Sequence, residues 1–570
     1  MPSSWPHLIA APILLPLLTA AVLLLMGEGR RSVKGAINVA VCALVLLIAV
    51  ALAWHANHAE GAQAIGVYLP GNWPVPYGIV LVADRLSALM LTLTAALALA
   101  ASIYATARWH RAGVHFHALF QLQLMGLNGA FLTGDLFNLF VFFEIMLTAS
   151  YGLLLHGSGW PRVRAGLHVI AINLMASTLF LIGAALLYGV TGTLNLADMA
   201  VAAAAIAPAD RGLRHAGAAI LAVAFLAKAG AWPLAFWLPG AYASAAAPIA
   251  ALFAVMTKLG VYALLRVWTL LFSVGSGASG SFGSPVITGI GLATLAFGAV
   301  GMLATRNLAR MAAFGVIVSS GTLLAAMGLR RAPITGAALY YAAASTLALG
   351  ALFLLIELID RARQAGESPQ LVSEALPSAP GRAGRGNMAF QTFAYEAETV
   401  RAAPPVPGVN LDDAGQALTG RAIPAAMAFL GLTFIACGLT LAGLPPLAGF
   451  VGKFSMLSAL LATRTMPTAG WLFFALLLAG GLLAMIAVAR AGIRSFWTPR
   501  AQPPRLLLAE TLPIVLLVAL LLLLTVFAGP ALRYTQAAAR ALYAPRNYIS
   551  AVIMTRPRPA PGAAGQQGAP

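Results

Sequence analysis

Charged side chains are scarce in this 570-residue chain, at 9% of residues, whereas a soluble domain usually carries about 25%. Hydrophobic residues make up 61%. This balance excludes a soluble enzyme with a single anchor and predicts a polytopic membrane protein. The net charge of +18 would suggest nucleic-acid binding in a soluble protein, but here the arginines are scattered through short loops. Topology signals and contacts with membrane lipids explain them better, so we expect no nucleic-acid partner.

Cysteine is nearly absent: Cys42 and Cys437 are the only two, and both lie in apolar runs. They offer neither a disulfide framework nor a metal or iron–sulfur spacing, and the nine His do not form a ligand cluster. Around Lys453, Leu447 and Phe454 stand where a phosphate-binding loop needs Gly and Ser or Thr. We therefore expect no cofactor, no metal site and no enzymatic activity, and a driving force that comes from an ion gradient or a partner subunit.

Lysine is also rare, and its positions are informative. Only four of the 34 basic residues are lysines, and Lys228, Lys258 and Lys453 lie inside apolar stretches long enough to cross a membrane. Arginine stays protonated, whereas a desolvated lysine can release a proton near neutral pH. Ionisable groups inside a bilayer are costly and by default mark an ion or proton path. The alternative is that each amine snorkels to the interface, which requires a position near a helix end.

One acid, Glu144, lies in a similarly apolar run, with aromatic and aliphatic residues on both sides. Its simplest structural role would be a carboxylate paired to a neighbouring helix, and its functional role a member of an ion path. A Glu–Lys pair is a two-state element. Apart, the acid tends to take a proton and the lysine to lose one; together, both charges are stabilised. Such coupled sites titrate as a unit. The acid Asp84, beside Arg85 at the start of a helix, is expected to form an interface pair.

Apolar stretches predict an all-α fold with about fourteen transmembrane helices, since a span needs about 20 apolar residues. The predicted spans are 8–26, 36–54, 78–106, 117–134, 136–155, 166–189, 215–237, 245–272, 285–304, 309–328, 333–359, 423–461, 470–495 and 506–528.

Two of these stretches are interrupted by proline. Pro233 and Pro239 follow Lys228 in the seventh, and Pro445 and Pro446 precede Lys453 in the twelfth. A helix break at membrane depth must line a cavity or contact protein, because lipid cannot satisfy the freed backbone groups. Paired breaks five helices apart predict two inverted five-helix repeats, helices 4–8 and 9–13, each with one discontinuous helix. The alternative is that these prolines mark ordinary loops.

The basic residues also suggest an orientation. Arginines concentrate in alternate loops, which places both termini outside, although the five arginines of the C-terminal tail argue against this. The predicted divisions are 1–107 (helices 1–3), 108–284 (first repeat), 285–500 (second repeat, with a long inner loop at 360–422), 501–530 (helix 14) and 531–570 (a partly disordered tail).

Four ordered segments resemble a known family. They are TGDLFNLFVFFE at 133–144, KAGAWPLAFWLP at 228–239, TKLGVY at 257–262 and GLPPLAGFVGKF at 443–454. They resemble the D-type subunit of the multi-subunit monovalent cation/proton antiporters of the Mrp, Mnh and Pha type. That superfamily includes the antiporter-like subunits of respiratory complex I. The resemblance covers about 80 to 530.

This resemblance implies a function and a set of roles. Glu144 and Lys228 would form the proton-site pair, Lys258 the central relay and Lys453 the terminal site. The chain would be the proton-translocating subunit of a hetero-oligomeric antiporter in a bacterial inner membrane, exchanging H⁺ for K⁺ or Na⁺ beside partner subunits. The long loop before the twelfth helix resembles the Pha branch, which is linked to potassium. Rival functions are a redox-driven pump subunit of a complex I or membrane hydrogenase assembly and a non-conducting scaffold subunit.

Two departures from the family pattern concern polar groups near the expected half-channels. Relatives often carry His where this chain has Ala344, and Asp-Ala-His where it has Gly-Ala-Tyr at 240–242. Both changes remove polar groups, so a proton route between Lys258 and Lys453 would depend on water or hydroxyl groups.

Overall fold

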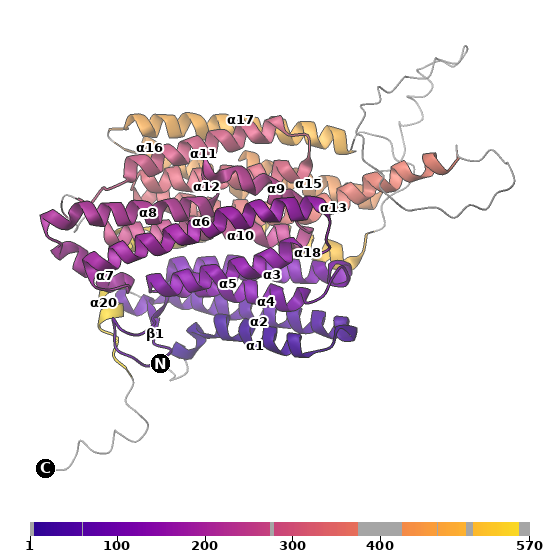
Figure 1. Ribbon diagram of the computed structural model, residues 1–570. Coiled ribbons are helices and arrows are strands. Elements are labelled where there is room, and N and C mark those ends of the chain that lie inside the picture. Colours follow the sequence, from indigo (N-terminus) through magenta and orange to yellow (C-terminus); the bar gives the residue numbers. More distant parts are fainter. Residues whose placement is uncertain are drawn as a thin grey trace.

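Long helices lie side by side in a computed structural model that describes residues 5–59, 61–273, 277, 279–373, 424–463, 465–496 and 506–557. Their axes run along one common direction (Figure 1). The first half contains α1 (Ala11–Leu25), α2 (Arg31–His58), α3 (Arg85–Ala107), α4 (Phe116–Leu132), α5 (Leu136–Leu154), α6 (Trp160–Thr191), α7 (Leu196–Ala205), α8 (Arg211–Ala229), α9 (Trp237–Ser244) and α10 (Ala247–Leu271). The second contains α11 (Ser284–Ala304), α12 (Leu308–Gly328), α13 (Ala332–Ser373), α15 (Ala425–Ala442), α16 (Ala448–Leu461), α17 (Thr468–Phe496), α18 (Leu508–Val526), α19 (Ala528–Tyr543) and α20 (Arg546–Ile553).

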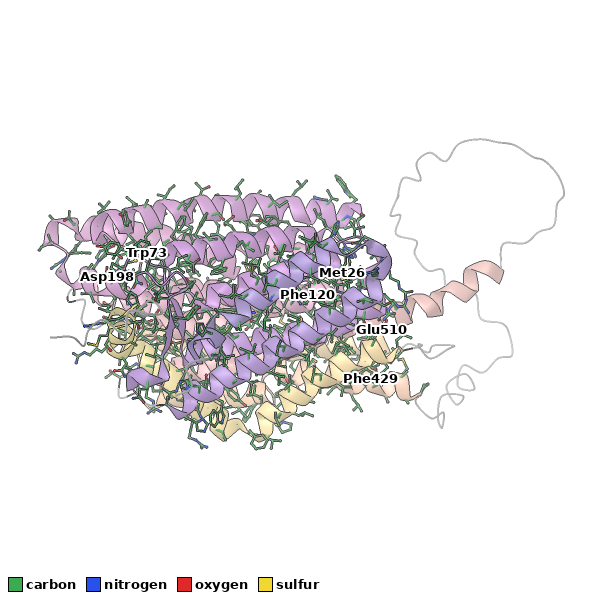
Figure 2. The ribbon with its side chains drawn as sticks, turned by 90° about the horizontal axis from the view of Figure 1, so that it is seen from below. Met26, Trp73, Phe120, Asp198, Phe429 and Glu510 are labelled. Carbon is green, nitrogen blue, oxygen red and sulfur yellow. The ribbon has the colours of Figure 1, made fainter. Side chains whose placement is uncertain are left out.

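Twelve helical segments among the described residues are long and apolar enough to cross a membrane, with α8 and α9 counted as one. The expected all-α membrane fold is therefore confirmed. The other two predicted spans, 8–26 and 117–134, correspond to α1 and α4, which have 15 and 17 residues. Met26, at the end of α1, lies at the same end of the bundle as Glu510, far from Trp73 (Figure 2). The number fourteen stays a prediction.

A short hairpin and two terminal helices, none of them expected, gather at one end of the bundle (Figure 1). The antiparallel strands β1 (Gly66–Tyr68) and β2 (Leu81–Ala83) pair Val67 with Val82. Here α20 and the short helix Trp5–Ile9 both contact β1. We call this the hairpin end. The tail expected from 531 is helical through Ile553, because α19 and α20 each bury one face, including Ala538 and Val552.

The opposite end, here called the Glu510 end, is where α13 continues outward as one helix to Ser373 (Figure 1). The expected start of the long loop at 360 is therefore wrong, and the rest of that loop, 374–423, lies outside the described residues. Near this end the buried carboxylate of Glu510 forms ion pairs with Arg361 at 2.7 Å and with Arg108 at 3.2 Å. These contacts fix α13 against α3 and α18.

At the hairpin end, Asp84 does not pair with Arg85. Its carboxylate caps α3 by accepting from the amide of Ser87, and it accepts from both terminal nitrogens of Arg266 at 2.6 and 2.7 Å. The partner lies on α10, 182 positions away in sequence. Asp84 therefore forms an ion pair, as expected, but its partner is Arg266 and not Arg85.

Matched turns support the predicted repeat. Between α4 and α5, the Thr133 hydroxyl accepts from the amide of Asp135, whose carboxylate caps α5. Between α11 and α12, Thr305 and Asn307 make the same two contacts at the start of α12. When this register is carried along both helices, Val316 occupies the place that Glu144 has in α5. The aligned position of the second repeat therefore has no acid.

Candidate functional site

The first helix break separates α8 from α9. Gly230 follows α8 at φ +66°, a left-handed conformation that glycine adopts without steric cost. The amides of Gly230 and Ala231 fold back onto carbonyls of the last turn of α8, the usual C-terminal capping pattern. The next amide, of Trp232, donates to the hydroxyl of Thr294 on α11 at 2.9 Å. Pro233 lies in the break, whereas Pro239 lies inside α9.

The second break, between α15 and α16, begins in the same way. Gly443 has φ +78°, and its amide and that of Leu444 return to carbonyls of α15. Pro445 and Pro446 follow, and α16 begins at Ala448. At Gly449 an added Cβ would overlap the Thr440 carbonyl oxygen, so only glycine allows this close approach.

Lys228 lies in the last turn of α8 and is 5% exposed. Its ammonium lies over the ring of Phe143, 4.9 Å from the centroid, and donates to the hydroxyl of Ser177 on α6 at 3.5 Å. Ser177 in turn donates to the carboxylate of Glu144. Across the described part of the chain, Glu144 and Lys228 share no direct ion pair. A single hydroxyl joins them instead.

Glu144 is less buried by the other helices than its apolar run alone would suggest. It is only partly buried on α5, whereas its neighbour Phe143 is fully buried. The carboxylate therefore lies at the flank of the bundle, with its inner side held by Ser177.

Lys258 is 2% exposed and lies in the middle of α10. The only hydrogen bond of its amine described here is to the hydroxyl of the adjacent Thr257, at 3.4 Å. A cavity of about 30 Å³ adjoins it, lined also by Tyr262, Leu323 and Thr335 but by no carboxylate. A cavity of about 20 Å³ adjoins Lys228. Each is large enough for about one water molecule.

Lys453 is 6% exposed and reaches back across the second break. Its ammonium donates to the carbonyls of Leu441 at 3.0 Å and Ala442 at 2.8 Å. These are the last two carbonyls of α15, which a helix end leaves without an intrahelical partner. The partial negative charge of a helix C-terminus also favours a cation here. Tyr341 of α13 lies beside the amine, with its ring centre 6.0 Å away.

Hydroxyl groups on α12 and α13 lie in the region between Lys258 of α10 and Lys453 of α16. Ser319 and Ser345 are hydrogen-bonded at 2.8 Å and fully buried. Thr322 of α12 is fully buried and donates to the carbonyl of Val318, and the ring of Tyr341 lies beside Lys453. The neighbouring positions Leu323 and Ala342 line the cavity of Lys258.

Sequence reasoning placed the three lysines in buried positions, but it did not identify Ser177 or the hydroxyl groups of α12 and α13. Serine and threonine are common in apolar helices, so the sequence carries no signal that selects these positions. Among the described residues no group of three or more His, Cys, Asp or Glu side chains could hold a metal ion. The site instead places amines, one carboxylate and hydroxyls in a low-dielectric interior, a set that can transfer protons.

Comparisons with known proteins agree with this arrangement. The family model described as NADH:quinone oxidoreductase/Mrp antiporter matches residues 133–373. The chain is 50% identical to a probable K⁺/H⁺ antiporter D-type subunit of Rhizobium meliloti (strain 1021), over 96% of this chain and 97% of the relative. It is 31% identical to the Na⁺/H⁺ antiporter D-type subunit of Bacillus subtilis (strain 168), over 96% and 99%.

Solved structures share the fold. A chain of the Mrp complex from Dietzia sp. DQ12-45-1b superposes with a TM-score of 0.76 at 25% identity, over 96% of this chain and 99% of that one. A chain of respiratory complex I from Thermus thermophilus gives 0.69 at 22% identity, over 94% and 99%. The chain thus belongs to the D-type subunit family of the multi-subunit monovalent cation/proton antiporters, within the superfamily that also supplies the antiporter-like subunits of complex I.

Proposed function

We propose that this chain is the proton-translocating subunit of a hetero-oligomeric K⁺/H⁺ antiporter, and that Glu144, Lys228, Lys258 and Lys453 carry the proton. The burial of three lysines, two of them at helix breaks, is the observation that carries the proposal. Buried amines are expensive unless they serve a function, and lysine is the basic residue able to release its proton.

The contact between Glu144 and Lys228 acts as the first switch. With Ser177 between them, the two charges stabilise each other through one shared hydroxyl. Movement of α5 relative to α8 separates them, and the carboxylate then gains a proton while the amine loses one. The partial exposure of Glu144 leaves its carboxylate at the surface of the chain, where a partner subunit could adjoin this switch.

The proton passes from Lys258 of α10 to Lys453 of α16 by way of α12 and α13. The cavity beside Lys258 has room for about one water molecule, and the paired hydroxyls of Ser319 and Ser345 lie on the helices that line it. Tyr341 of α13, whose ring lies beside Lys453, would continue this hydroxyl series toward the terminal amine. Water and hydroxyl groups would thus transfer the proton at the place where relatives often carry a His and this chain has Ala344.

Potassium is the cation that we propose, in preference to sodium. The relative that is 50% identical carries K⁺/H⁺ in its name, whereas the relatives at 31% identity carry Na⁺/H⁺. The long segment before α15 points the same way. The chain acts as a transporter subunit and not as an enzyme, and its partners are the sister subunits of the complex and the exchanged ions.

The chain lies in the bacterial inner membrane with both termini outside. Trp5–Ile9 and α20 meet at the hairpin end, which is consistent with an even number of crossings (Figure 1). Arg108 after α3, and Arg162 and Arg164 in the first turns of α6, lie at the opposite end, and a concentration of basic residues favours the cytoplasmic side. Labelling of single cysteines introduced at Gln63 and Gly29 with a membrane-impermeant reagent tests this orientation.

Replacement of Glu144 tests the function. In everted vesicles that contain the whole set of subunits, Glu144→Gln should lower K⁺-driven dissipation of a pH gradient by more than about tenfold, because an amide cannot carry the proton. Na⁺ in place of K⁺ should dissipate the gradient less in the wild type. Normal exchange in a normally assembled Glu144→Gln complex would show that the pathway lies elsewhere. Copurification with quinone or nickel–iron subunits would favour the redox-driven alternative, and a variant that loses assembly but not flux per complex would favour the scaffold.

A further inference from the structure

A basic groove opens at the surface where the starts of α6 and α12 meet α9. Its volume is about 610 Å³, many times that of the cavities beside the lysines. Arg164 and His168 of α6 line one side, and Asn307 and Arg310 at the start of α12 line the other. Arg162, two residues from Arg164, lies over the ring of Trp109, which places this groove at the Glu510 end. The proton pathway uses none of these side chains.

Positive charge in this groove has no countercharge within the chain. In the described part of the structure, neither the Arg164 nor the Arg310 guanidinium forms an ion pair with a carboxylate, and both are exposed. The side-chain oxygen of Asn307 is already used to cap α12. Two guanidinium groups that line one groove without a carboxylate partner among the described residues are suited to an anionic phosphate, which accepts hydrogen bonds from such groups.

Apolar surface adjoins the two arginines. Trp160 is 73% exposed and Phe236 60% exposed at the rim of the groove, as is usual for aromatic residues at the level of lipid headgroups. Along α6, Leu167 and Leu174 are also exposed and continue away from the groove toward the middle of the helix. The surface is basic at the arginines, then aromatic at the rim, then aliphatic along α6. A ligand with an anionic headgroup and acyl chains would complement these three regions in that order.

We propose that this groove binds the headgroup of an anionic phospholipid, with the phosphate between Arg164 and Arg310 and the acyl chains along the exposed leucines of α6. Basic pockets between transmembrane helices recognise such headgroups by the same charge complementarity. The site also adjoins the first break. Trp237 of α9 lines both this groove and the cavity of Lys228. A bound lipid therefore supports the half-helix that forms one wall of the Lys228 site.

Short-chain lipids allow a direct test on the assembled complex in neutral detergent. Dihexanoyl phosphatidylglycerol is titrated while the melting temperature is followed, with dihexanoyl phosphatidylcholine and inorganic phosphate as parallel arms. The wild-type complex should be stabilised saturably by phosphatidylglycerol alone. Arg164→Gln/Arg310→Gln should need on the order of 30-fold more of this lipid, from the loss of two surface charges. Native mass spectrometry of the same samples counts the lipids retained.

The matched control is Arg306→Gln/Arg494→Gln, which removes the same charge from exposed arginines that do not line the groove. The melting temperature of this control should rise with the phosphatidylglycerol concentration in the same way as that of the wild-type complex. The single variants Arg164→Gln and Arg310→Gln, each expected to weaken binding about fivefold, keep the test decisive if the double variant does not assemble. The proposal would be overturned if the wild type and the groove variants needed the same phosphatidylglycerol concentration for stabilisation. Equal stabilisation by phosphatidylcholine would also overturn it, as would a phosphate effect that matches the lipid, which would indicate a simple anion site.

Discussion

The two helix breaks have the same backbone design but give their lysines different partners. Both begin with a left-handed glycine and a pair of amides that return to the preceding helix. At the first break, Lys228 faces a hydroxyl that is hydrogen-bonded to an acid. At the second, Lys453 donates to two backbone carbonyls. A carboxylate can change its charge, whereas a carbonyl cannot.

The proton affinity of each amine therefore depends on a different property of its surroundings. That of Lys228 depends on the protonation of Glu144, so it reports the charge state of its neighbour. That of Lys453 depends on how closely α16 approaches the end of α15, so it reports the geometry of the break. Under the proposed function, the first break would provide chemical coupling and the second conformational coupling. Val316, at the position of α12 that aligns with Glu144 of α5, is consistent with this difference.

The largest expected effect comes from lysine-to-arginine replacement, which keeps the charge and removes the exchangeable proton. Lys228→Arg and Lys453→Arg should each lower exchange by about 100-fold or more, measured as pH-gradient dissipation in everted vesicles. Lys34→Arg is the matched control. Its amine forms an ion pair with Glu28 outside the proposed path, and arginine preserves that pair. If Lys453→Arg keeps exchange while Lys228→Arg loses it, Lys453 serves only as a helix cap.

A smaller effect separates the two lysines by stability. Lys453→Met leaves the carbonyls of Leu441 and Ala442 without their donor and should lower the free energy of unfolding by about 1–3 kcal/mol. Lys228→Met keeps the bond between Ser177 and Glu144, so it should cost less than about 1 kcal/mol. Thermal melting of the purified complex measures both. Equal melting temperatures for the two variants would contradict the assigned difference.

The smallest effect concerns the link between Glu144 and Lys228. Ser177→Ala removes the shared hydroxyl but leaves the amine on the Phe143 ring, so exchange should fall only about fivefold, equivalent to the loss of roughly one hydrogen bond. The pH optimum of exchange should also move, which a purely structural role would not cause. Ser177→Thr, which retains the hydroxyl, should restore both. A variant with alanine that keeps the wild-type pH profile would argue against a bridging role.

The sequence was sufficient for the features that composition and hydropathy determine. Scarce charge predicted the membrane fold, and lysine in apolar runs predicted the burial of Lys228, Lys258 and Lys453. Proline located the breaks, although Pro239 proved to lie within α9. The partial burial of Glu144 by other helices could not be read from the sequence, because an apolar run does not reveal which face of a helix is covered.

Contacts between distant segments were beyond the reach of the sequence. Asp84 found Arg266 on another helix and not its neighbour Arg85, because helix packing and not sequence order chooses the partner. The terminal helices α19 and α20 have too few apolar residues to resemble spans, and their order comes from the bundle surface that they cover. Ser177 became identifiable only once α5, α6 and α8 were placed together.

Helix α13 also joins the interior to the exterior as a single stiff element. Tyr341 and Ser345 lie near one end of it, and it reaches Ser373 without interruption, a distance of roughly 48 Å from Tyr341 at 1.5 Å per residue. The ion pair between Glu510 and Arg361 lies between these points, so Arg361 can act as the pivot of the helix. A protein that pulls on the outer end would therefore work a lever whose longer arm, from Arg361 inward, displaces the hydroxyls beside Lys453.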